Sequence, residues 1–178
     1  PRLAGAAADM DHAHADHPRL FLSYSRKDAK YRSELTTHLA VLARDHDIYA
    51  WTDETIRGGE FWRKAIDQGL AYAEIVILLV SANALTSKFI LDNEVAKAIR
   101  AKKVIYPILV KDCAWDEVPW LEARMMRPRV GPSLSLKPLN KLRPADRDGV
   151  LSDITREISG LLKGAAAGAK PKRQKVNS

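Results

Sequence analysis

Few side chains in this 178-residue chain stand in a pattern with known chemistry. Neither GxGxxG nor GxxxxGK(S/T) occurs, which argues against a Rossmann-type dinucleotide site and against ATP hydrolysis of the Walker type. GxSxG and His-Glu-x-x-His are also missing, so neither an α/β-hydrolase nor a zinc protease is indicated. Cys113 is the only cysteine and has no histidine close to it in sequence, which does not favour a thiol nucleophile.

Three histidines near the N-terminus are spaced closely enough to be considered as metal ligands: His12, His14 and His17. They lie in a segment rich in Ala, Asp and His, without apolar periodicity, and we predict a disordered tail over residues 1–18. Metal binding needs ligands in a fixed geometry, which such a tail does not supply. We therefore expect no metal site and no resident cofactor.

Short apolar runs alternate with helical periods between the two ends of the chain. We predict strands at 19–24, 47–51, 75–80, 103–110 and 133–136, and helices after residue 28, after residue 59, over 91–101 and over 151–161. This alternation predicts an α/β protein with a flavodoxin-like open five-stranded parallel sheet, order 2-1-3-4-5, with helices on both faces. Ligands of such sheets bind outside the carboxyl ends of the strands, near the loops after Tyr24, Trp51 and Val80.

Two features of the predicted elements concern single residues. Ser25 and Asp28 form a Ser-x-x-Asp signal at a helix start, in which each side chain is expected to accept a backbone N–H. Pro107 cannot donate to a strand ladder, so its position in the run 103–110 predicts an edge or a bulge.

The net charge of +7 is concentrated at the C-terminal end. Residues 163–178 carry five cations and no acid, and we interpret them as a basic linker or tail, which leads to a partner domain or binds a polyanion. The near-neutral body does not favour direct nucleic-acid binding. The longest apolar run, Ile75–Val80, is too short to cross a bilayer, so we expect a cytoplasmic protein without membrane insertion.

Three segments, taken in order, resemble the TIR (Toll/interleukin-1 receptor) domain family, particularly its bacterial members. The first is FLSYSRKD, which looks like the opening strand and loop of the family. The second is WTD followed by IRGGEFW, similar to the BB loop. The third is IVILLVS followed by SKF and a glutamate. The resemblance covers residues 19–162, which we take as the TIR domain.

The resemblance implies an activity. Many bacterial, plant and some animal TIR domains cleave the nicotinamide–ribose bond of NAD⁺ and release nicotinamide with ADP-ribose or a cyclic isomer. The glutamate that matches the family's catalytic position is Glu94. Nicotinamide leaves as a neutral molecule, so one carboxylate that stabilises the oxocarbenium-like ribose suffices without a general acid. We expect Glu94 in the first turn of its helix, where the helix dipole favours the ionised form.

The resemblance also implies residues that contact the substrate. These are Tyr24, Ser25, Arg26, Asp53, Phe61 and Phe89. Arg26 and the backbone N–H groups of its loop suit a pyrophosphate, and Asp53 suits a ribose hydroxyl. The alternatives are helix capping for Ser25, an Asx-turn for Asp53 and core packing for Phe61.

The family often has a tryptophan four residues before its glutamate, whereas this chain has Ile90 there with Phe89 beside it. Phe89 takes the aromatic position if the start of the helix is shifted by one residue.

The BB-loop segment is expected to mediate self-association into a homo-oligomer or a filament. Its residues are Ile56, Arg57, Gly58, Gly59 and Glu60.

Activation of NAD⁺ cleavage by self-association, in bacterial defence or signalling, is the leading hypothesis. The alternative is a non-catalytic TIR adaptor or effector that binds other TIR domains. A phosphoacceptor domain on the same fold lacks the acidic cluster it would need at the strand ends.

Overall fold

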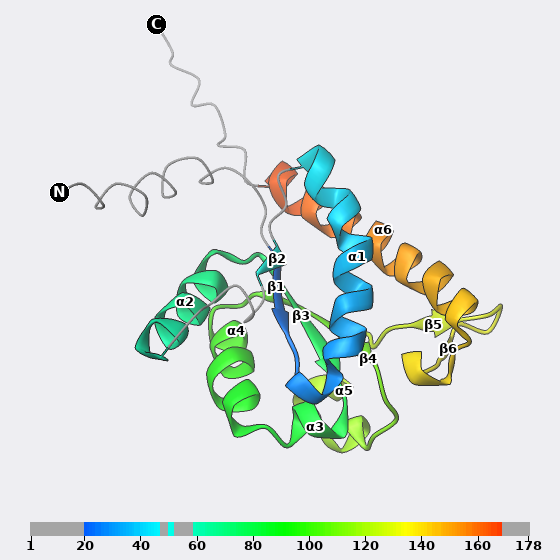
Figure 1. The fold of residues 1–178 in the computed structure, drawn as a ribbon, viewed down its shortest axis with the longest axis horizontal. Coiled ribbons are helices and arrows are strands. Elements are labelled where there is room, and N and C mark those ends of the chain that lie inside the picture. Colours follow the sequence, from blue (N-terminus) through cyan, green and yellow to red (C-terminus); the bar gives the residue numbers. More distant parts are fainter. Residues whose placement is uncertain (1–19, 47–49, 52–58, 169–178) are drawn as a thin grey trace, which may run out of the picture.

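A computed structural model describes residues 20–46, 50–51 and 59–168 (Figure 1). Its main sheet consists of four parallel strands, β1 (Leu20–Ser23), β2 (Ala50–Trp51), β3 (Ile75–Val80) and β4 (Val104–Leu109). They lie in the order β2-β1-β3-β4. This confirms the predicted α/β class and the first four places of the predicted strand order.

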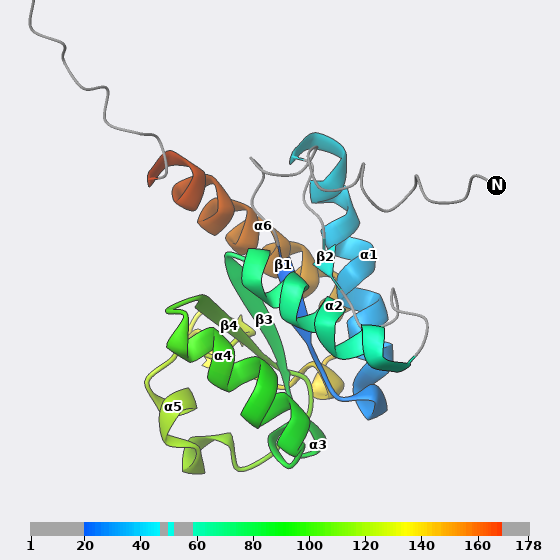
Figure 2. The ribbon, with the colours of Figure 1, turned by 90° about the vertical axis from the view of Figure 1, so that its left-hand side faces the viewer.

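Helices cover both faces of the sheet (Figures 1 and 2). The α-helices are α1 (Ala29–His46), α2 (Gly59–Tyr72), α3 (Ala82–Leu85), α4 (Ala96–Arg100), α5 (Pro119–Glu122) and α6 (Pro144–Gly168). A π-helix, η3 (Ile90–Val95), leads into α4. Short 3₁₀ helices are η1 (Arg26–Asp28), η4 (Trp115–Glu117) and η5 (Leu139–Lys141). Helices α1 and α6 cover one face, and α2 and α4 the other.

The central strand β3 explains why its sequence is apolar without alternation. Successive side chains of a strand point to opposite faces, and here both faces are covered by helices. Ile75, Ile77 and Leu79 belong to the core under α1 and α6. Val76, Leu78 and Val80 belong to the core under α2 and α4. Every side chain of β3 is therefore buried.

The fifth strand lies elsewhere than predicted. Residues Ser135–Leu136 form β6, which pairs antiparallel with β5 (Arg129–Val130) in a separate two-stranded sheet. The place beside β4 is taken by an isolated parallel bridge between Ile108 and Arg127. Directly after this bridge, the Pro128 carbonyl accepts a hydrogen bond from the Lys137 N–H at 3.1 Å, so the chain pairs with the β6 segment rather than with β4.

The backbone groups of Pro107 face the outer edge of β4, away from β3. Its carbonyl accepts a hydrogen bond from the Arg127 N–H at 3.0 Å. Because the N–H and C=O of one strand residue point to the same side, the N–H that proline lacks faces this sparsely paired edge rather than β3. The prediction of an edge position is confirmed.

Helix α6 continues past the boundary predicted at residue 162. It ends at Gly168, so residues 163–168 are helical rather than the start of a linker. The alanines in this segment have the highest helix propensity of all residues and extend the helix.

A partly exposed polar cluster joins α6 to β4. The Tyr106 hydroxyl donates to Glu157 Oε2 at 2.7 Å, and Arg127 Nε donates to the same oxygen at 2.6 Å. Burial, with the Glu157 hydrogen bond, raises the pKa of Tyr106 far above its ordinary value. Tyr106 therefore remains a hydrogen-bond donor at any physiological pH. Within the described ranges, no helix is long and apolar enough to cross a membrane.

Replacing a β3 side chain tests the assignment of the core. Leu79→Ala removes a fully buried side chain and is expected to lower the free energy of unfolding by about 2–5 kcal/mol. The same substitution at the partly exposed Leu161 should cost less than about 1 kcal/mol. Urea denaturation of both variants measures the difference, and equal losses would contradict the assignment.

Candidate functional site

Polar side chains meet at the carboxyl edge of the sheet, where parallel strands present their ends together. Ser23 ends β1, Ser81 follows β3, and Lys111 lies two residues after β4. Ser23 and Ser81 are almost fully buried. This edge is where ligands of open α/β sheets bind, as the sequence predicts.

The Glu94 carboxylate is buried at this edge. The residue is 7% exposed, and Ser23 Oγ donates a hydrogen bond to Glu94 Oε2 at 2.5 Å. Asp92, two residues earlier, is exposed, so the two acids face different surroundings. A carboxylate removed from bulk water interacts more strongly with a nearby positive charge than one in solvent does. The environment of Glu94 therefore suits the stabilisation of a cation.

The helix around Glu94 is not the one predicted. Helical residues begin at Lys88, so Glu94 lies beyond the first turn, and the placement at the positive end of the helix dipole is wrong. Glu94 belongs instead to the π-helix η3, which closes with a bond from the Ala96 N–H to the Leu91 carbonyl. π-Helical turns are rare and occur often at functional sites.

The π-helix changes which residues share a side of the helix with Glu94. A π-helix has more residues per turn than an α-helix, so residues four and five apart lie on roughly the same side. Phe89, five residues before Glu94, is half-buried and packs against the core under α2 and α4. Ile90 is 4% exposed and belongs to that core. The role of Phe89 as the aromatic contact in place of the family's tryptophan stays a prediction.

The loop after β1 carries three of the predicted substrate-contacting residues. Tyr24 is buried, with the Arg32 guanidinium 5.5 Å from its ring centroid. Ser25 is half-buried and Arg26 is exposed. The predicted cap is wrong, because the Ser25 side chain makes no capping hydrogen bond and the Asp28 N–H donates to the Ser25 carbonyl at 2.7 Å.

Asp28 has a different role from the predicted one. Its carboxylate is fully buried, accepts a hydrogen bond from Ser81 Oγ at 2.5 Å and forms an ion pair with Lys111 Nζ at 2.6 Å. Sequence analysis did not single out Ser81 or Lys111 and read Asp28 as a cap. The buried pairs cross between strands: the serine of β1 binds the acid that follows β3, and the serine after β3 binds the acid that follows β1.

Part of the predicted site lies outside the described residues, namely Asp53, Ile56, Arg57 and Gly58. Gly59 and Glu60, predicted in the self-association loop, belong to the first turn of α2 instead. The apolar residues that follow them recur at helical spacing. The first N–H groups of a helix have no intrahelical partner, so Gly59 and Glu60 can begin α2. Phe61 is also in α2, so its backbone is helical.

Other nucleophile and metal sites find little support. Burial, together with the charge of Asp112, raises the pKa of the Cys113 thiol, which does not favour a thiolate nucleophile. Among the residues that the structure describes, no group of three or more His, Cys, Asp and Glu side chains is placed to hold a metal ion.

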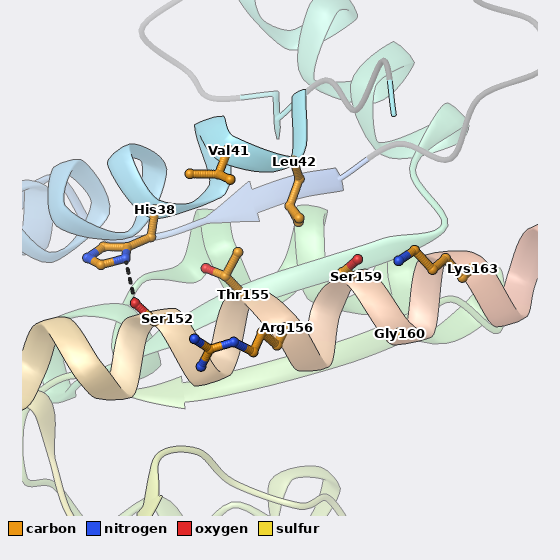
Figure 3. A pocket seen from close by; sticks show the side chains of 9 residues that line it. All are labelled: His38, Val41, Leu42, Ser152, Thr155, Arg156, Ser159, Gly160 and Lys163. Atoms are coloured by element: carbon orange, nitrogen blue, oxygen red, sulfur yellow. Dashed lines mark hydrogen bonds between the residues drawn. The ribbon is translucent and has the colours of Figure 1, made fainter. Parts of the chain in front are cut away.

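A pocket of about 420 Å³ lies between α1 and α6 (Figure 3). His38 and Ser152 face each other across it, with the His38 Nδ1 and Ser152 Oγ atoms 3.4 Å apart. The pocket lies on the α1 and α6 side of the sheet, whereas Glu94 and Phe89 belong to the helix on the other side. It contains none of the residues predicted for NAD⁺.

Comparisons with known proteins identify the family. A family model described as TIR domain matches residues 20–131. An uncharacterised protein y4lF of Sinorhizobium fredii (strain NBRC 101917 / NGR234) is 30% identical over 163 residues, 86% of this chain and 50% of that protein. The chain thus spans about half the length of this curated relative. It belongs to the TIR domain family.

A solved structure of a TIR domain is similar in fold. The TIR domain of the Toll-related receptor TRR-2 from Hydra magnipapillata matches with a TM-score of 0.50 and 18% identity, covering 79% of this chain and 97% of that chain. The TIR domains of the activated Roq1 resistosome, which recognises the pathogen effector XopQ, match with a TM-score of 0.48 and 14% identity, covering 79% of this chain and 99% of that one.

A double-mutant cycle tests the pairing of Ser23 with Glu94. Ser23→Ala and Glu94→Ala should couple by about 1 kcal/mol or more, because each removes the buried partner of the other. Ser23→Ala combined with Asp92→Ala, an exposed acid nearby, should be additive within about 0.5 kcal/mol. Chemical denaturation supplies the energies. Additivity in the first cycle would contradict the hydrogen bond.

Proposed function

We propose that this TIR domain is an NAD⁺ glycohydrolase that cleaves the nicotinamide–ribose bond, with Glu94 as its catalytic residue. The observation that supports this most is the buried Glu94 carboxylate, which accepts a hydrogen bond from Ser23 at the ligand-binding edge of the sheet. A solvated glutamate on a helix surface would not supply such an environment.

The reaction breaks the bond between the anomeric carbon of the ribose and the nicotinamide nitrogen. The bonding electrons leave with nicotinamide, which changes from a pyridinium to a neutral molecule, so no proton is needed at the leaving group. Positive charge then develops on the ribose, and the ionised Glu94 stabilises it. Water adds to the anomeric carbon and releases a proton, giving ADP-ribose. Attack by a nitrogen of the adenine base gives a cyclic isomer instead.

Ser23 has a defined part in this proposal. Its hydroxyl is fixed by the sheet, because Ser23 is in register with Leu78 of β3. A donor held on a strand limits the positions open to the carboxylate and favours its charged form. Glu94 then requires little reorganisation when the ribose becomes positive, which is the basis of electrostatic preorganisation.

Substrate contacts extend over the neighbouring loops in this proposal. The exposed Arg26 guanidinium binds the pyrophosphate, with Tyr24 and Ser25 beside it, because a planar guanidinium matches phosphate oxygens. Asp53 binds a ribose hydroxyl, Phe61 contributes to the site and Phe89 stacks on the nicotinamide ring.

Self-association completes the proposal. A loop that includes residues 56–58 contacts a second copy, giving a homo-oligomer or a filament, since head-to-tail contacts that do not close generate open assemblies. Bacterial defence or signalling in the cytoplasm, with a partner domain outside this chain, is the setting we propose.

One observation favours a second candidate function, a non-catalytic adaptor that binds other TIR domains. Ile90 occupies the place of the family's tryptophan and is buried in the core, where it offers no aromatic surface to a ligand. Without an aromatic contact, the edge of the sheet would serve only to position loops that bind another TIR domain. NAD⁺ cleavage by concentrated protein decides between the two.

Release of nicotinamide tests the enzyme directly. Concentrated or artificially clustered protein should convert NAD⁺ to nicotinamide, and Glu94→Gln should lower kcat by about 10²–10³-fold because it removes the charge but keeps the shape. The matched control is Asp92→Asn at the exposed acid nearby, which should leave kcat within about twofold. Chromatographic analysis of the products measures both variants and shows whether ADP-ribose is linear or cyclic. Intact NAD⁺ at high protein concentration would leave the adaptor function.

Replacing Phe89 tests the aromatic contact. Phe89→Ala is expected to lower kcat/KM for NAD⁺ by about 5–100-fold, since stacking on an aromatic side chain is worth about 1–3 kcal/mol per base. Phe89→Trp keeps an aromatic face and should retain activity near the wild-type value. Steady-state kinetics measure both. Equal losses in the two variants would contradict the stacking and point to a packing role.

A further inference from the structure

We propose that Asp28 is a positioning residue: through Ser81 and Lys111 it fixes the Tyr24–Lys27 loop, and so sets the affinity for the dinucleotide rather than the rate of bond cleavage. This inference rests on the proposed function, since the ligand of the loop is the substrate named there. We call Asp28, Ser81 and Lys111 the clamp.

Asp28 is the buried member of the clamp, whereas 35% of the Lys111 side chain is exposed. Asp28 is 0% exposed, with one carboxylate oxygen bound by Ser81 Oγ at 2.5 Å and the other by Lys111 Nζ at 2.6 Å. Replacing a buried ion pair with apolar side chains of similar volume is often neutral or stabilising. Stability alone is therefore a weak reason to keep this pair here, and a specific backbone position is a better one.

The clamp contacts the C-terminal end of the loop. Lys111 Nζ lies 3.5 Å from the Lys27 carbonyl, which accepts from it, and 5.9 Å from the centroid of the Tyr31 ring in α1. The Asp28 N–H donates to the Ser25 carbonyl at 2.7 Å. Ser81 Oγ also accepts from the Ala84 N–H at 3.2 Å, so α3 is tied to the same carboxylate.

Fixed points on either side leave the loop little freedom. Ser23 is held in the sheet next to β3, and Asp28 is held by the clamp, with only Tyr24–Lys27 between them. A loop ordered before binding loses less conformational entropy on binding, which raises affinity. Glu94 is held separately, by Ser23, so the loss of the clamp should weaken substrate binding and leave the chemical step nearly unchanged.

The test uses three variants and one control. Asp28→Asn and Lys111→Met each break the ion pair, and the double variant removes both charges. Asp112→Asn is the matched control, because Asp112 is an exposed acid beside Lys111 that pairs with Lys141. We expect the KM for NAD⁺ to rise about tenfold in all three clamp variants, with kcat within about threefold, and no change in the control.

A merely structural role is distinguished by the double variant. Lys111→Met leaves the buried Asp28 carboxylate without its cation and should lower Tm, whereas the double variant also removes the carboxylate charge and should recover most of the wild-type Tm. If the clamp sets the affinity for the dinucleotide, the KM of the double variant stays raised although its Tm recovers. A KM that returns to the wild-type value together with Tm overturns the proposal, as does a fall in kcat at unchanged KM.

Amide hydrogen exchange separates this inference from the proposed function. In ligand-free protein, the amides of Tyr24–Lys27 should exchange faster in the clamp variants than in Asp112→Asn, and unchanged exchange overturns the clamp whatever the activity. If the wild type releases no nicotinamide, the glycohydrolase proposal fails by itself, and calorimetric affinity for NAD⁺ replaces KM. A tenfold weaker affinity in the clamp variants then supports the clamp, while equal affinity, or no binding by any form, overturns its role in ligand affinity.

Discussion

Two buried carboxylates, each held by a serine at the end of a neighbouring strand, set the geometry at the carboxyl edge of this sheet. Ser23 of β1 donates to Glu94, which follows β3, and Ser81 after β3 donates to Asp28, which follows β1. Each bond joins the end of one strand to the segment after the other strand. Adjacent parallel strands bring these groups together, because their carboxyl ends lie on the same edge of the sheet.

The two carboxylates differ in their environment. Asp28 has Lys111 against it at 2.6 Å, so its charge is neutralised locally and it is suited to holding backbone in place. Glu94 accepts the Ser23 hydroxyl and lies in a π-helical turn, a rare element that occurs often at functional sites. Burying a carboxylate costs free energy unless hydrogen bonds and charges compensate it. In the proposed function, the positive charge that develops on the ribose compensates part of the cost of burying the Glu94 carboxylate. This charge is present only while the bond to nicotinamide breaks.

The core provides the rigidity that this edge requires. The side chains of β3 fill two separate cores, one under α1 and α6 and one under α2 and α4, so the strand that precedes Ser81 is held on both faces. On the outer side of β4, Pro107 and the single bridge at Arg127 end the parallel sheet, and the chain turns into the β5–β6 pair. The Pro128 carbonyl bonds to the Lys137 N–H, so the predicted fifth strand belongs to a small antiparallel sheet instead.

The alternation of strands and helices is predictable from local patterns, because the apolar runs and helical periods record which faces are buried. The flavodoxin-like class predicted from this alternation carried the order of the first four strands, and the resemblance of FLSYSRKD and its companion segments indicated the family. Tertiary structure decided what local patterns do not encode. The Ser-x-x-Asp signal predicted a cap, yet Asp28 binds side chains 53 and 83 residues away, and such partners are specified only by the packing of strand ends. The same holds for Glu94: its residue type was visible, but its burial against Ser23 and the π-helical turn around it arise where a helix meets the edge of the sheet.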